Sequence, residues 1–387
     1  MDITIHPRSL RGEIHMIPSK SQAHRLLICA AFADRPTQLR CEATNRDIEA
    51  TADCLLALGA EINRMETGYS VIPASTVPRQ AVLNCCESGS TLRFMLPIVG
   101  ALGVDATILM EGRLPQRPLS PLWEEMERMG CSLSRPTPET LRCTGKLRPG
   151  TYTIDGGVSS QFITGLLLAF PLMEGESSLE ITGKLESAPY VEMTKAALAL
   201  FPNGHSPGNI AVEGDWSNGA FFLAAKALGN NIAVSNLNPD SPQGDRICTH
   251  WFSQLPQSRC TIDASDIPDL VPILSVVAAC NHGAVFRNIQ RLRIKESDRV
   301  TSTIAMLEAL GGCAEATEDT LTVFGTGLTG GTVDAVNDHR IAMSAAIAST
   351  VCSRSVTVLG EECVRKSYPT FWEEFTRLGG NYEQYLR

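Results

Sequence analysis

Residues 87–102 read ESGSTLRFMLPIVGAL, a short polar segment that leads directly into an apolar stretch of helical length. Five other stretches have the same form: PSKSQAHRLLICAAFA from Pro18, GVSSQFITGLLLAF from Gly157, DWSNGAFFLAAKAL from Asp215, IPDLVPILSVVAA from Ile267 and NDHRIAMSAAIAS from Asn337. We call the six stretches the repeat helices and their polar beginnings the lead segments. They begin roughly 50 to 70 residues apart, a period that indicates repeated supersecondary units.

A second, more amphipathic helix follows most of the repeat helices and often ends at a glycine. Examples are RDIEATADCLLALGA from Arg46, PLSPLWEEMERMGC from Pro118 and KESDRVTSTIAMLEALGG from Lys295. Their apolar residues recur at three- and four-residue spacing. Short alternating segments such as LTVFG and GTVDAV predict strands between the helices. The sequence therefore predicts a mixed α/β (α+β) fold of six repeated units, three in each of two domains, with a boundary near Gly204 to Gly214.

The bulk composition is that of a globular protein. Of the 387 residues, 43% are hydrophobic and 19% are charged. No apolar stretch approaches the ~20 residues that span a bilayer, and the first residues lack the apolar run of a signal peptide. The net charge of −9 disfavours a nucleic-acid binder, which usually has a basic face. We therefore predict a cytoplasmic protein without a membrane or nucleic-acid partner.

The 13 cysteines are scattered along the chain, and no two of them have CxxC spacing. In a reducing compartment such residues behave as small hydrophobic side chains. The sequence therefore predicts neither disulfide bonds nor a metal site, and it indicates no cofactor.

The lead segments place polar side chains where helix N-termini offer free N–H groups and a partial positive charge, both of which favour anions. For any single segment the simpler interpretation is an ordinary N-cap. Cations are unfavourable at helix N-termini, so their recurrence there indicates bound anions. We expect residues 295–299 to begin a helix. The charged residues at or near these positions are Lys20, Arg25, Arg93, Arg117, Lys295, Glu296, Asp298, Arg299, Asp338, His339, Arg340 and Lys366.

Ten motifs appear in order along the chain: PSKSQAHR, ESGSTLR, QRP, GVSSQF, VEGDWSNGAFFLAA, QGD, IPD, RIKESDR, NDHRIAM and KSYPTFWEEF. Together they resemble the enolpyruvylshikimate-phosphate synthase family over nearly the whole sequence. The resemblance implies two similar domains, each of three βαβαββ-type repeats with buried parallel helices, and an active site in the cleft between the domains. It also implies that residues 1–18 and 215–387 form one domain and residues 19–214 the other.

The resemblance implies an enolpyruvyl transferase of the shikimate pathway, in which aromatic amino acids are made through chorismate. Such an enzyme moves the enolpyruvyl group of phosphoenolpyruvate to the 5-hydroxyl of shikimate 3-phosphate and releases phosphate, through a tetrahedral intermediate. The shikimate 3-phosphate ligands, mainly in domain 19–214, would be Lys20, Ser21, Arg25, Ser159, Ser160, Gln161, Ser187, Asp269 and Lys295. The ligands of phosphoenolpyruvate, whose side is the other domain, would be Lys20, Gly89, Arg93, Arg117, Gln161, Arg299, Arg340 and Lys366.

Within these sets the resemblance gives particular roles. Ser21 and Arg25 would hold the shikimate carboxylate. Arg299 and Arg340 would clamp the carboxylate of phosphoenolpyruvate, because a guanidinium can grip a carboxylate with two parallel hydrogen bonds. The shikimate phosphate would be bound by Ser159, Ser160, Gln161 and Ser187.

The reaction needs a base for the ring hydroxyl and a proton donor for the methylene carbon. We expect Asp269 to be the base and either Glu296 or Lys20 to be the donor. Neighbouring cations would lower the pKa of Lys20 and anionic ligands would raise it, so the sequence leaves its protonation state open. The simpler interpretations are a helix cap for Asp269 and a first-turn carboxylate for Glu296.

Three features depart from the family's usual pattern. Glu87 stands where many members have the asparagine of an N-A-G-T motif, and an acid there would repel phosphoenolpyruvate unless it points away. Arg291 stands where some members have an asparagine that touches the shikimate ring. Residues 201–210 are short for the family, as though a hairpin were trimmed.

Two other functions compete with this one. The sister enzyme that uses UDP-N-acetylglucosamine commonly has a reactive cysteine in the loop before its equivalent of Arg117, but residues 111–116 read EGRLPQ. A non-catalytic anion-binding protein on the same scaffold would be expected to lose Asp269 and Glu296, and both are present. We therefore predict a monomeric enzyme with two small anionic substrates, whose hinged domains close on them.

Overall fold

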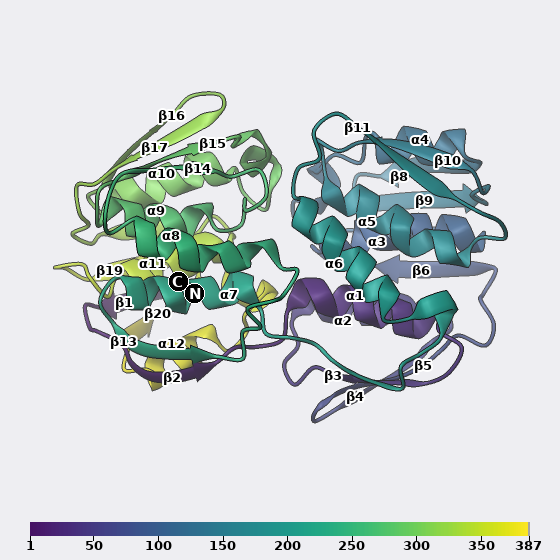
Figure 1. Ribbon diagram of the computed structural model, residues 1–387, viewed down its shortest axis with the longest axis horizontal. Coiled ribbons are helices and arrows are strands. Elements are labelled where there is room, and N and C mark those ends of the chain that lie inside the picture. Colours follow the sequence, from purple (N-terminus) through teal and green to yellow (C-terminus); the bar gives the residue numbers. More distant parts are fainter. Residues whose placement is uncertain (386–387) are drawn as a thin grey trace. The chain divides into compact units, whose positions relative to one another are not determined.

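The computed structural model describes residues 1–385 and divides the chain into two compact units (Figure 1). The first unit consists of Met1–Ile17 and Gly214–Arg387, and the second of Pro18–Glu213. The chain therefore begins in the first unit, forms the whole of the second and returns. Each boundary lies one residue from the one expected from the sequence. Each unit is built around a hydrophobic core of its own.

Six α-helices in each unit lie within the described residues. Those of the second unit are α1 (Lys20–Ala31), α2 (Arg46–Ala57), α3 (Gly89–Leu102), α4 (Leu122–Arg128), α5 (Ser160–Ala169) and α6 (Ala188–Ala199). Those of the first unit are α7 (Trp216–Ala227), α8 (Cys248–Gln254), α9 (Val271–Ala279), α10 (Arg299–Ala309), α11 (His339–Ala348) and α12 (Phe371–Arg377). The short 3-10 helices are η1 (Leu114–Gln116), η2 (Phe170–Leu172), η3 (Pro202–Gly204), η4 (Gly244–Ile247), η5 (Gln290–Ile294) and η6 (Glu361–Lys366).

The strands of each unit form two four-stranded sheets and one parallel pair. In the second unit the sheets are β12-β3-β5-β4 (Asn209–Ala211, Thr37–Arg40, Gly68–Ile72, Glu61–Met65), β6-β7-β9-β8 (Gln80–Asn84, Asp105–Leu109, Thr140–Gly145, Cys131–Thr137) and β10-β11 (Thr151–Asp155, Ser178–Thr182). In the first unit they are β18-β19-β1-β20 (Thr332–Asp334, Val356–Leu359, Asp2–His6, Asn381–Tyr385), β14-β15-β17-β16 (Cys260–Asp263, Ala284–Arg287, Thr320–Phe324, Cys313–Ala316) and β13-β2 (Asn231–Ser235, Arg11–His15).

The same βαβαββ order recurs in both units. It is continuous in β6-α3-β7-α4-β8-β9 and in β14-α9-β15-α10-β16-β17. In all four larger sheets one parallel pair is extended by two antiparallel strands. The run β10-α5-β11-α6 has only the parallel pair, and so does its counterpart in the first unit, in which β2 is followed, after the chain returns from the second unit, by α7-β13-α8. The trimmed hairpin expected near residues 201–210 corresponds to the short connection from α6 through η3 to β12.

The repeat helices are buried within their units because they are apolar on nearly all sides. In the second unit, α3 packs against α5, and α1 and α5 both contact α6. The approach of α3 and α5 is very close: a Cβ atom on Gly165 would lie 2.2 Å from the backbone oxygen of Arg93. In the first unit, α7, α9 and α11 contact one another. Among the described helices, none is long and apolar enough to cross a membrane.

Side chains of the lead segments cap five of the six repeat helices. In the second unit, Ser19, Ser88 and Ser159 each accept a hydrogen bond from a backbone N–H in the first turn of α1, α3 and α5. In the first unit, Asp215 and Asp338 do the same for α7 and α11. The simpler interpretation as N-caps is therefore correct for these five side chains. The caps of the second unit are neutral, whereas those of the first carry charge.

Candidate active site

The predicted site residues fall into two sets, one in each unit. In the first unit, the expectation that a helix begins at Lys295 is wrong. α10 begins at Arg299 because Asp298 caps it by accepting two backbone N–H groups of the first turn. Lys295 and Glu296 lie in the bend before that cap. This arrangement leaves a cationic side chain at the start of a helix, so acidic neighbours are needed to balance it.

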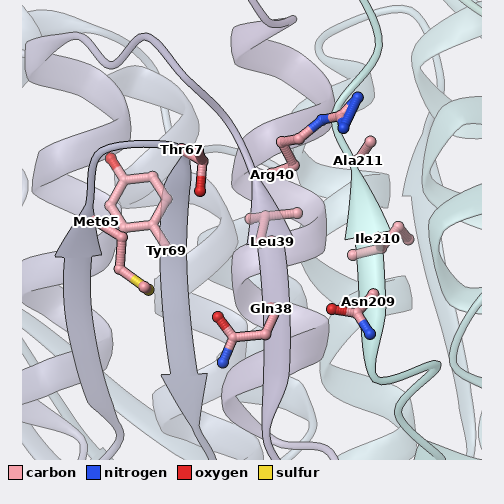
Figure 2. Close-up of a pocket in the computed structure, with 9 residues that line it drawn as sticks. All are labelled: Gln38, Leu39, Arg40, Met65, Thr67, Tyr69, Asn209, Ile210 and Ala211. Atoms are coloured by element: carbon pink, nitrogen blue, oxygen red, sulfur yellow. The ribbon is translucent and has the colours of Figure 1, made fainter.

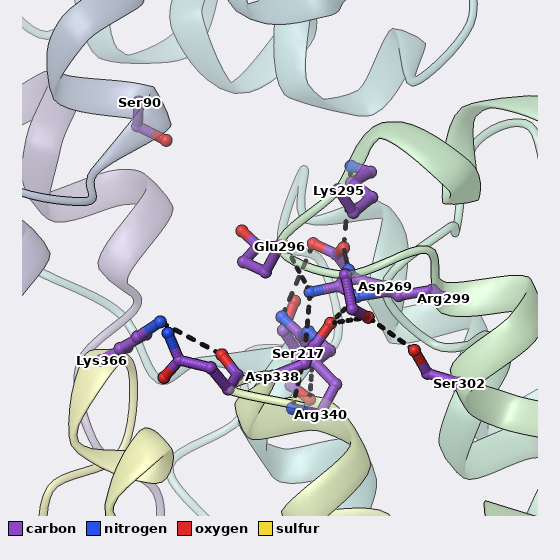
Figure 3. A network of polar contacts seen from close by, with 12 residues as sticks. Ser90, Ser217, Asp269, Lys295, Glu296, Arg299, Ser302, Asp338, Arg340 and Lys366 are labelled. Atoms are coloured by element: carbon purple, nitrogen blue, oxygen red, sulfur yellow. Dashed lines mark hydrogen bonds and ion pairs between the residues drawn. The ribbon is translucent and has the colours of Figure 1, made fainter. Parts of the chain in front are cut away.

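Three carboxylates surround the guanidinium of Arg299, whose side chain is 1% exposed (Figure 3). Its Nε donates to Oδ2 of Asp338 over 2.9 Å, Nη1 to Oδ1 of Asp269 over 2.5 Å and Nη2 to Oε2 of Glu296 over 2.6 Å. Glu296 is therefore bound to a side chain and is not a free first-turn carboxylate. All three guanidinium nitrogens of Arg299, one of the two arginines of the predicted carboxylate clamp, therefore donate to acids of the chain itself.

The opposite charges of this cluster stabilise one another in their ionised forms. Burial alone would lower the pKa of Arg299, but the three carboxylates outweigh it and raise the pKa above its usual value. Burial would likewise raise the pKa of Asp338, but Arg299 holds it below its usual value. Asp338 also accepts from Ser297 Oγ over 2.9 Å and from the backbone N–H of Arg340 over 3.0 Å. Asp338 is thus a buried, ionised side chain that orients Arg299.

Asp269 contacts three cations. Besides Arg299, its oxygens lie 3.7 Å from Nζ of Lys295 and 3.5 Å from Nη2 of Arg340. Burial lowers the pKa of Lys295 to about 8, against the opposing effect of Asp269. The interpretation of Asp269 as a helix cap is wrong, because α9 follows Leu270 and has no side-chain cap. Its carboxylate is held by side chains and is a group that can accept a proton.

Asp245 is a site residue that the sequence analysis missed. Its side chain belongs to η4, is 3% exposed and accepts a hydrogen bond from Ser217 Oγ. The backbone oxygen of Ser217 in turn accepts from Nη1 of Arg340 over 3.3 Å. Burial, followed by the nearby charge of Asp269, raises the pKa of Asp245 to about 7. The QGD motif was visible in the sequence, but only the packing of η4 against α7 buries this acid.

Lys366 reaches the same region from η6. Its Nζ donates to the backbone oxygen of Asn337 over 3.1 Å, directly before the lead-segment residues Asp338 and Arg340 (Figure 3). Arg291, which departs from the family pattern, lies near enough to Lys295 to lower its pKa. The first unit thus brings together Asp269, Lys295, Glu296, Arg299, Arg340 and Lys366.

Arg25 is the most buried cation of the second set, at 2% exposed. Its Nε donates to Thr194 Oγ1 over 2.9 Å, Nη1 to the Ser21 carbonyl over 2.5 Å, and Nη2 to Thr164 Oγ1 over 3.2 Å and to the Tyr190 carbonyl over 3.0 Å. All four acceptors are neutral. Burial lowers the pKa of Arg25 to about 10, so the side chain stays protonated at neutral pH.

Gln161 of α5 forms hydrogen bonds with two residues of α3. Its Oε1 accepts from Nη1 of Arg93 over 2.7 Å, and its Nε2 donates to Ser90 Oγ over 3.0 Å. Arg93 also donates to the Pro118 carbonyl over 3.1 Å, and its guanidinium lies 5.5 Å from the centre of the Phe162 ring. An amide, a carbonyl and an aromatic face thus help to orient Arg93.

Gly89 lies under two guanidinium groups at the start of α3. A Cβ atom there would be 2.5 Å from Nη1 of Arg117 and 2.9 Å from Nη1 of Arg93. The glycine is needed because any side chain would displace one of the arginines. The structure thus brings Gly89, Arg93, Arg117 and Gln161 together.

Lys20 of the second unit is held by an acid. Its Nζ lies 2.9 Å from Oδ2 of Asp47, in the first turn of α2. Asp47 is a second acid that the sequence analysis missed, because the pairing depends on how α1 and α2 pack. Among the predicted serines, Ser159 caps α5, Ser160 opens that helix, and Ser187 precedes α6 with a left-handed backbone (φ 57°).

A cavity of about 390 Å³ lies elsewhere in the second unit (Figure 2). It opens on the sheet β12-β3-β5-β4 and is lined by Gln38, Leu39, Arg40, Met65, Thr67, Tyr69, Asn209, Ile210 and Ala211. It contains none of the predicted site residues, which lie instead in the side-chain networks described above. Within residues 1–385, no group of three or more His, Cys, Asp or Glu side chains is placed to hold a metal ion.

Comparisons with known proteins identify the family of the chain. The family model for EPSP synthase (3-phosphoshikimate 1-carboxyvinyltransferase) matches residues 5–375. Proteins named 3-phosphoshikimate 1-carboxyvinyltransferase from Clostridium kluyveri and Clostridium beijerinckii are 37% and 35% identical to the chain, over 99% of its length and 98% and 99% of theirs.

Solved structures of similar fold include EPSP synthase from Acinetobacter baumannii, with a TM-score of 0.78, 22% identity and coverage of 99% of this chain and 100% of that one. The enolpyruvyl transferase NikO from Streptomyces tendae follows with a TM-score of 0.76, 17% identity and coverage of 99% and 98%. They confirm the predicted α/β fold of two repeat-built units. On the full-length family match and the identity to its named relatives, the chain belongs to the EPSP synthase (3-phosphoshikimate 1-carboxyvinyltransferase) family.

Proposed function

We propose that this protein transfers the enolpyruvyl group of phosphoenolpyruvate to the 5-hydroxyl of shikimate 3-phosphate and releases phosphate. The observation that carries the proposal is the cluster in which Asp269 and Glu296 share the guanidinium of Arg299. A protein that only bound anions would need the cations of this cluster, but it would have no use for two acids that compete with the ligand. An enzyme that moves two protons needs both.

Shikimate 3-phosphate is assigned mainly to the second unit. Arg25 and Ser21 take the carboxylate, since Arg25 is held by neutral acceptors and keeps its full charge. The phosphate is assigned to the N-terminal turn of α5, where backbone N–H groups and hydroxyls converge. The residues proposed for the phosphate are Ser159, Ser160, Gln161 and Ser187. Lys20 bridges the two substrates, and Asp269 and Lys295 complete the shikimate 3-phosphate set.

Phosphoenolpyruvate is assigned to arginines of both sets. Arg299 and Arg340 take its carboxylate, in exchange for the acids that hold Arg299 in the structure. The charges of its phosphate are balanced by the cations around Gly89 and by those near Asn337. The residues proposed for this part are Lys20, Gly89, Arg93, Arg117, Gln161 and Lys366.

The proton steps use the acids that the exchange releases. Asp269 accepts the proton of the 5-hydroxyl while the hydroxyl oxygen forms a bond to the substituted carbon of phosphoenolpyruvate. Glu296 or Lys20 delivers a proton to the methylene carbon. The tetrahedral adduct then returns a proton from that methyl carbon to the group that delivered it, the carbon–oxygen bond to phosphate breaks, and phosphate leaves with the proton that Asp269 accepted. Acid–base steps of this kind contribute ~10²–10⁴-fold each. No covalent bond to the enzyme and no metal ion enters the balance.

Phosphate release tests the proposal directly. Purified protein is incubated with phosphoenolpyruvate and shikimate 3-phosphate without added metal, and with UDP-N-acetylglucosamine in place of shikimate 3-phosphate as the control. We expect release that requires both substrates and fails with the UDP-sugar. Release with the UDP-sugar would assign the protein to the sister reaction, and no release with either acceptor would favour an anion-binding protein.

The proposed reaction needs one chain and two diffusible substrates. We accordingly expect a monomer in the cytoplasm that requires no nucleic-acid or membrane partner. Light scattering of the purified protein, with and without both substrates, checks the monomer; a stable dimer would contradict it.

A further inference from the structure

Glu87 is the acid that stands where many family members have an amide. It lies between β6 and α3, directly before the capping residue Ser88. Cys86, the residue before it, has a left-handed backbone (φ 48°) and donates its N–H to Oδ1 of Asn84 over 2.9 Å. The chain therefore makes a fixed turn that sets the direction of the Glu87 side chain.

The carboxyl group of Glu87 lies against Gly112. A Cβ atom on Gly112 would be 1.9 Å from Oε1 and 2.7 Å from Cδ of Glu87, so an added side chain there would displace the carboxyl group of Glu87. Gly112 also has a left-handed backbone (φ 57°), which glycine adopts without steric cost. One residue earlier, the N–H of Glu111 donates to the carbonyl of Cys86 over 2.8 Å.

The loop that Glu87 touches ends at Arg117. After Gly112 the chain forms η1, and the N–H of Arg117 donates to the carbonyl of Leu114 over 3.1 Å. The guanidinium of Arg117 then lies over Gly89, at the other side of the same short segment. Residues 86–89 thus support the loop of residues 111–117 at both its ends.

We propose that Glu87 is a positioning residue, whose carboxyl group holds the loop of residues 111–117 so that Arg117 lies over Gly89. The inference rests on the proposed function, because the role of Arg117 toward phosphoenolpyruvate does. The competing account is electrostatic: a fixed negative charge near the site would weaken the binding of an anion by repulsion. The contact with Gly112 favours the positioning role, because the carboxyl group of Glu87 packs against the loop of residues 111–117.

The two accounts predict opposite changes for Glu87→Ala. Loss of the support lets Arg117 move, and misplacement of a binding group by about 1 Å can cost up to ~10²-fold. We expect Glu87→Ala to raise the KM for phosphoenolpyruvate about tenfold, or about 1.4 kcal/mol, with the KM for shikimate 3-phosphate unchanged. Glu87→Gln keeps the shape of the side chain and its packing against Gly112, and should stay within about threefold of wild type. Repulsion would instead make both variants bind phosphoenolpyruvate more tightly.

Gly112→Ala attacks the same contact from the loop. Its matched control is Gly208→Ala in the same unit, because Gly208 also has a left-handed backbone (φ 80°) but nothing lies within 4 Å of its added Cβ. We expect Gly112→Ala to raise the KM for phosphoenolpyruvate at least as much as Glu87→Ala, and Gly208→Ala to leave it unchanged. The double variant Glu87→Ala/Gly112→Ala should be no worse than Gly112→Ala alone, since the clash is gone.

Three results would overturn the inference while the proposed function stands. They are a lower KM for phosphoenolpyruvate in both Glu87 variants, equal effects of Gly112→Ala and Gly208→Ala, and a rise in KM that is the same for both substrates. A wild-type protein that releases no phosphate from either substrate pair would instead overturn the proposed function, and the positioning role with it.

Discussion

The two units share a repeat but hold their cations differently. In the second unit serines cap the repeat helices, and Arg25 and Arg93 are bound by hydroxyls, an amide and carbonyls. In the first unit aspartates cap α7 and α11, and Arg299 is bound by three carboxylates. Lys20, a predicted site residue of the second unit, is instead paired with the acid Asp47.

This difference indicates how the reaction is divided between the units. Neutral partners orient Arg25 without cancelling its charge, so this buried cation of the second unit can still attract an anionic ligand. Carboxylate partners cancel the charge of Arg299 until a ligand carboxylate replaces one of them. We infer that the second unit mainly binds, whereas the first exchanges its own acids for the ligand and thereby frees them for proton transfer.

The largest effect should follow from Asp269→Asn. The amide keeps the size of the side chain but cannot accept the hydroxyl proton, so kcat should fall by at least ~10²-fold. Shikimate 3-phosphate binding, measured by calorimetry, should stay within a few-fold. The control is Glu308→Gln, which neutralises an exposed acid on α10, the helix that carries Arg299. Near-normal turnover in Asp269→Asn would remove the catalytic role of the first unit.

Arg340→Ala should have the next largest effect. Arg340 is 4% exposed and contacts Asp269 and the Ser217 carbonyl. Loss of a charged hydrogen-bonding partner costs about 1.5–3 kcal/mol, so the KM for phosphoenolpyruvate should rise about 10- to 100-fold while that for shikimate 3-phosphate changes little. Arg365→Ala, at an exposed position of η6, is the control and should resemble wild type. Equal effects on both substrates would contradict the carboxylate clamp.

Gly89→Ala tests the binding unit without removing a charge. The added methyl group would lie 2.5 Å from Arg117 and 2.9 Å from Arg93. We expect the KM for phosphoenolpyruvate to rise about tenfold, equivalent to about 1.4 kcal/mol, and kcat to change less. Gly219→Ala in α7 controls for the helix-stabilising effect of alanine, because its methyl group meets only the flexible side chains of Leu237 and Met16 and no predicted site residue. Unchanged kinetics in Gly89→Ala would show that the arginines adapt freely.

The repeat helices could be predicted from the sequence because they depend on local patterns, and the same patterns pointed to charged side chains that lie close together within each unit. α3 begins at Gly89 within the stretch that was expected to be helical, and the lead segments contain the capping side chains. The cations were found through their positions in motifs. A local pattern cannot predict which side chain each charged residue will contact. That contact depends on the packing of helices that lie tens of residues apart in the sequence.

Asp47 and Asp245 illustrate that limit. Each is an acid whose role depends on another helix: Asp47 meets Lys20 of α1, and Asp245 meets Ser217 of α7. The sequence placed both near motifs but gave no reason to bury or pair them. The start of α10 was misplaced for a related reason, because Asp298 competes as a cap within a run of charged residues.

Asp245→Asn should give the smallest effect. It tests whether the proton bound by Asp245 of the first unit makes the stability of the folded protein depend on pH. The pKa of Asp245 is raised from 3.8 to about 7 in the folded protein, first by burial and then by Asp269. Between about pH 4 and pH 7 the unfolded chain has lost this proton while the folded protein keeps it, so stability falls as the pH rises through that range. Asparagine carries no proton to lose and still accepts from Ser217. The variant should therefore lose less stability than wild type from pH 5 to pH 8 and should melt at the higher temperature at pH 8.

Tryptophan fluorescence can follow this transition, because Trp216, Trp251 and Trp372 lie in the first unit and Trp123 in the second. Parallel melting curves for wild type and Asp245→Asn across the pH range would show that Asp245 is ionised throughout, like Asp338. The first unit would then balance its cations with permanent charge alone, and the contrast with the second unit would be one of partner identity and not of proton binding.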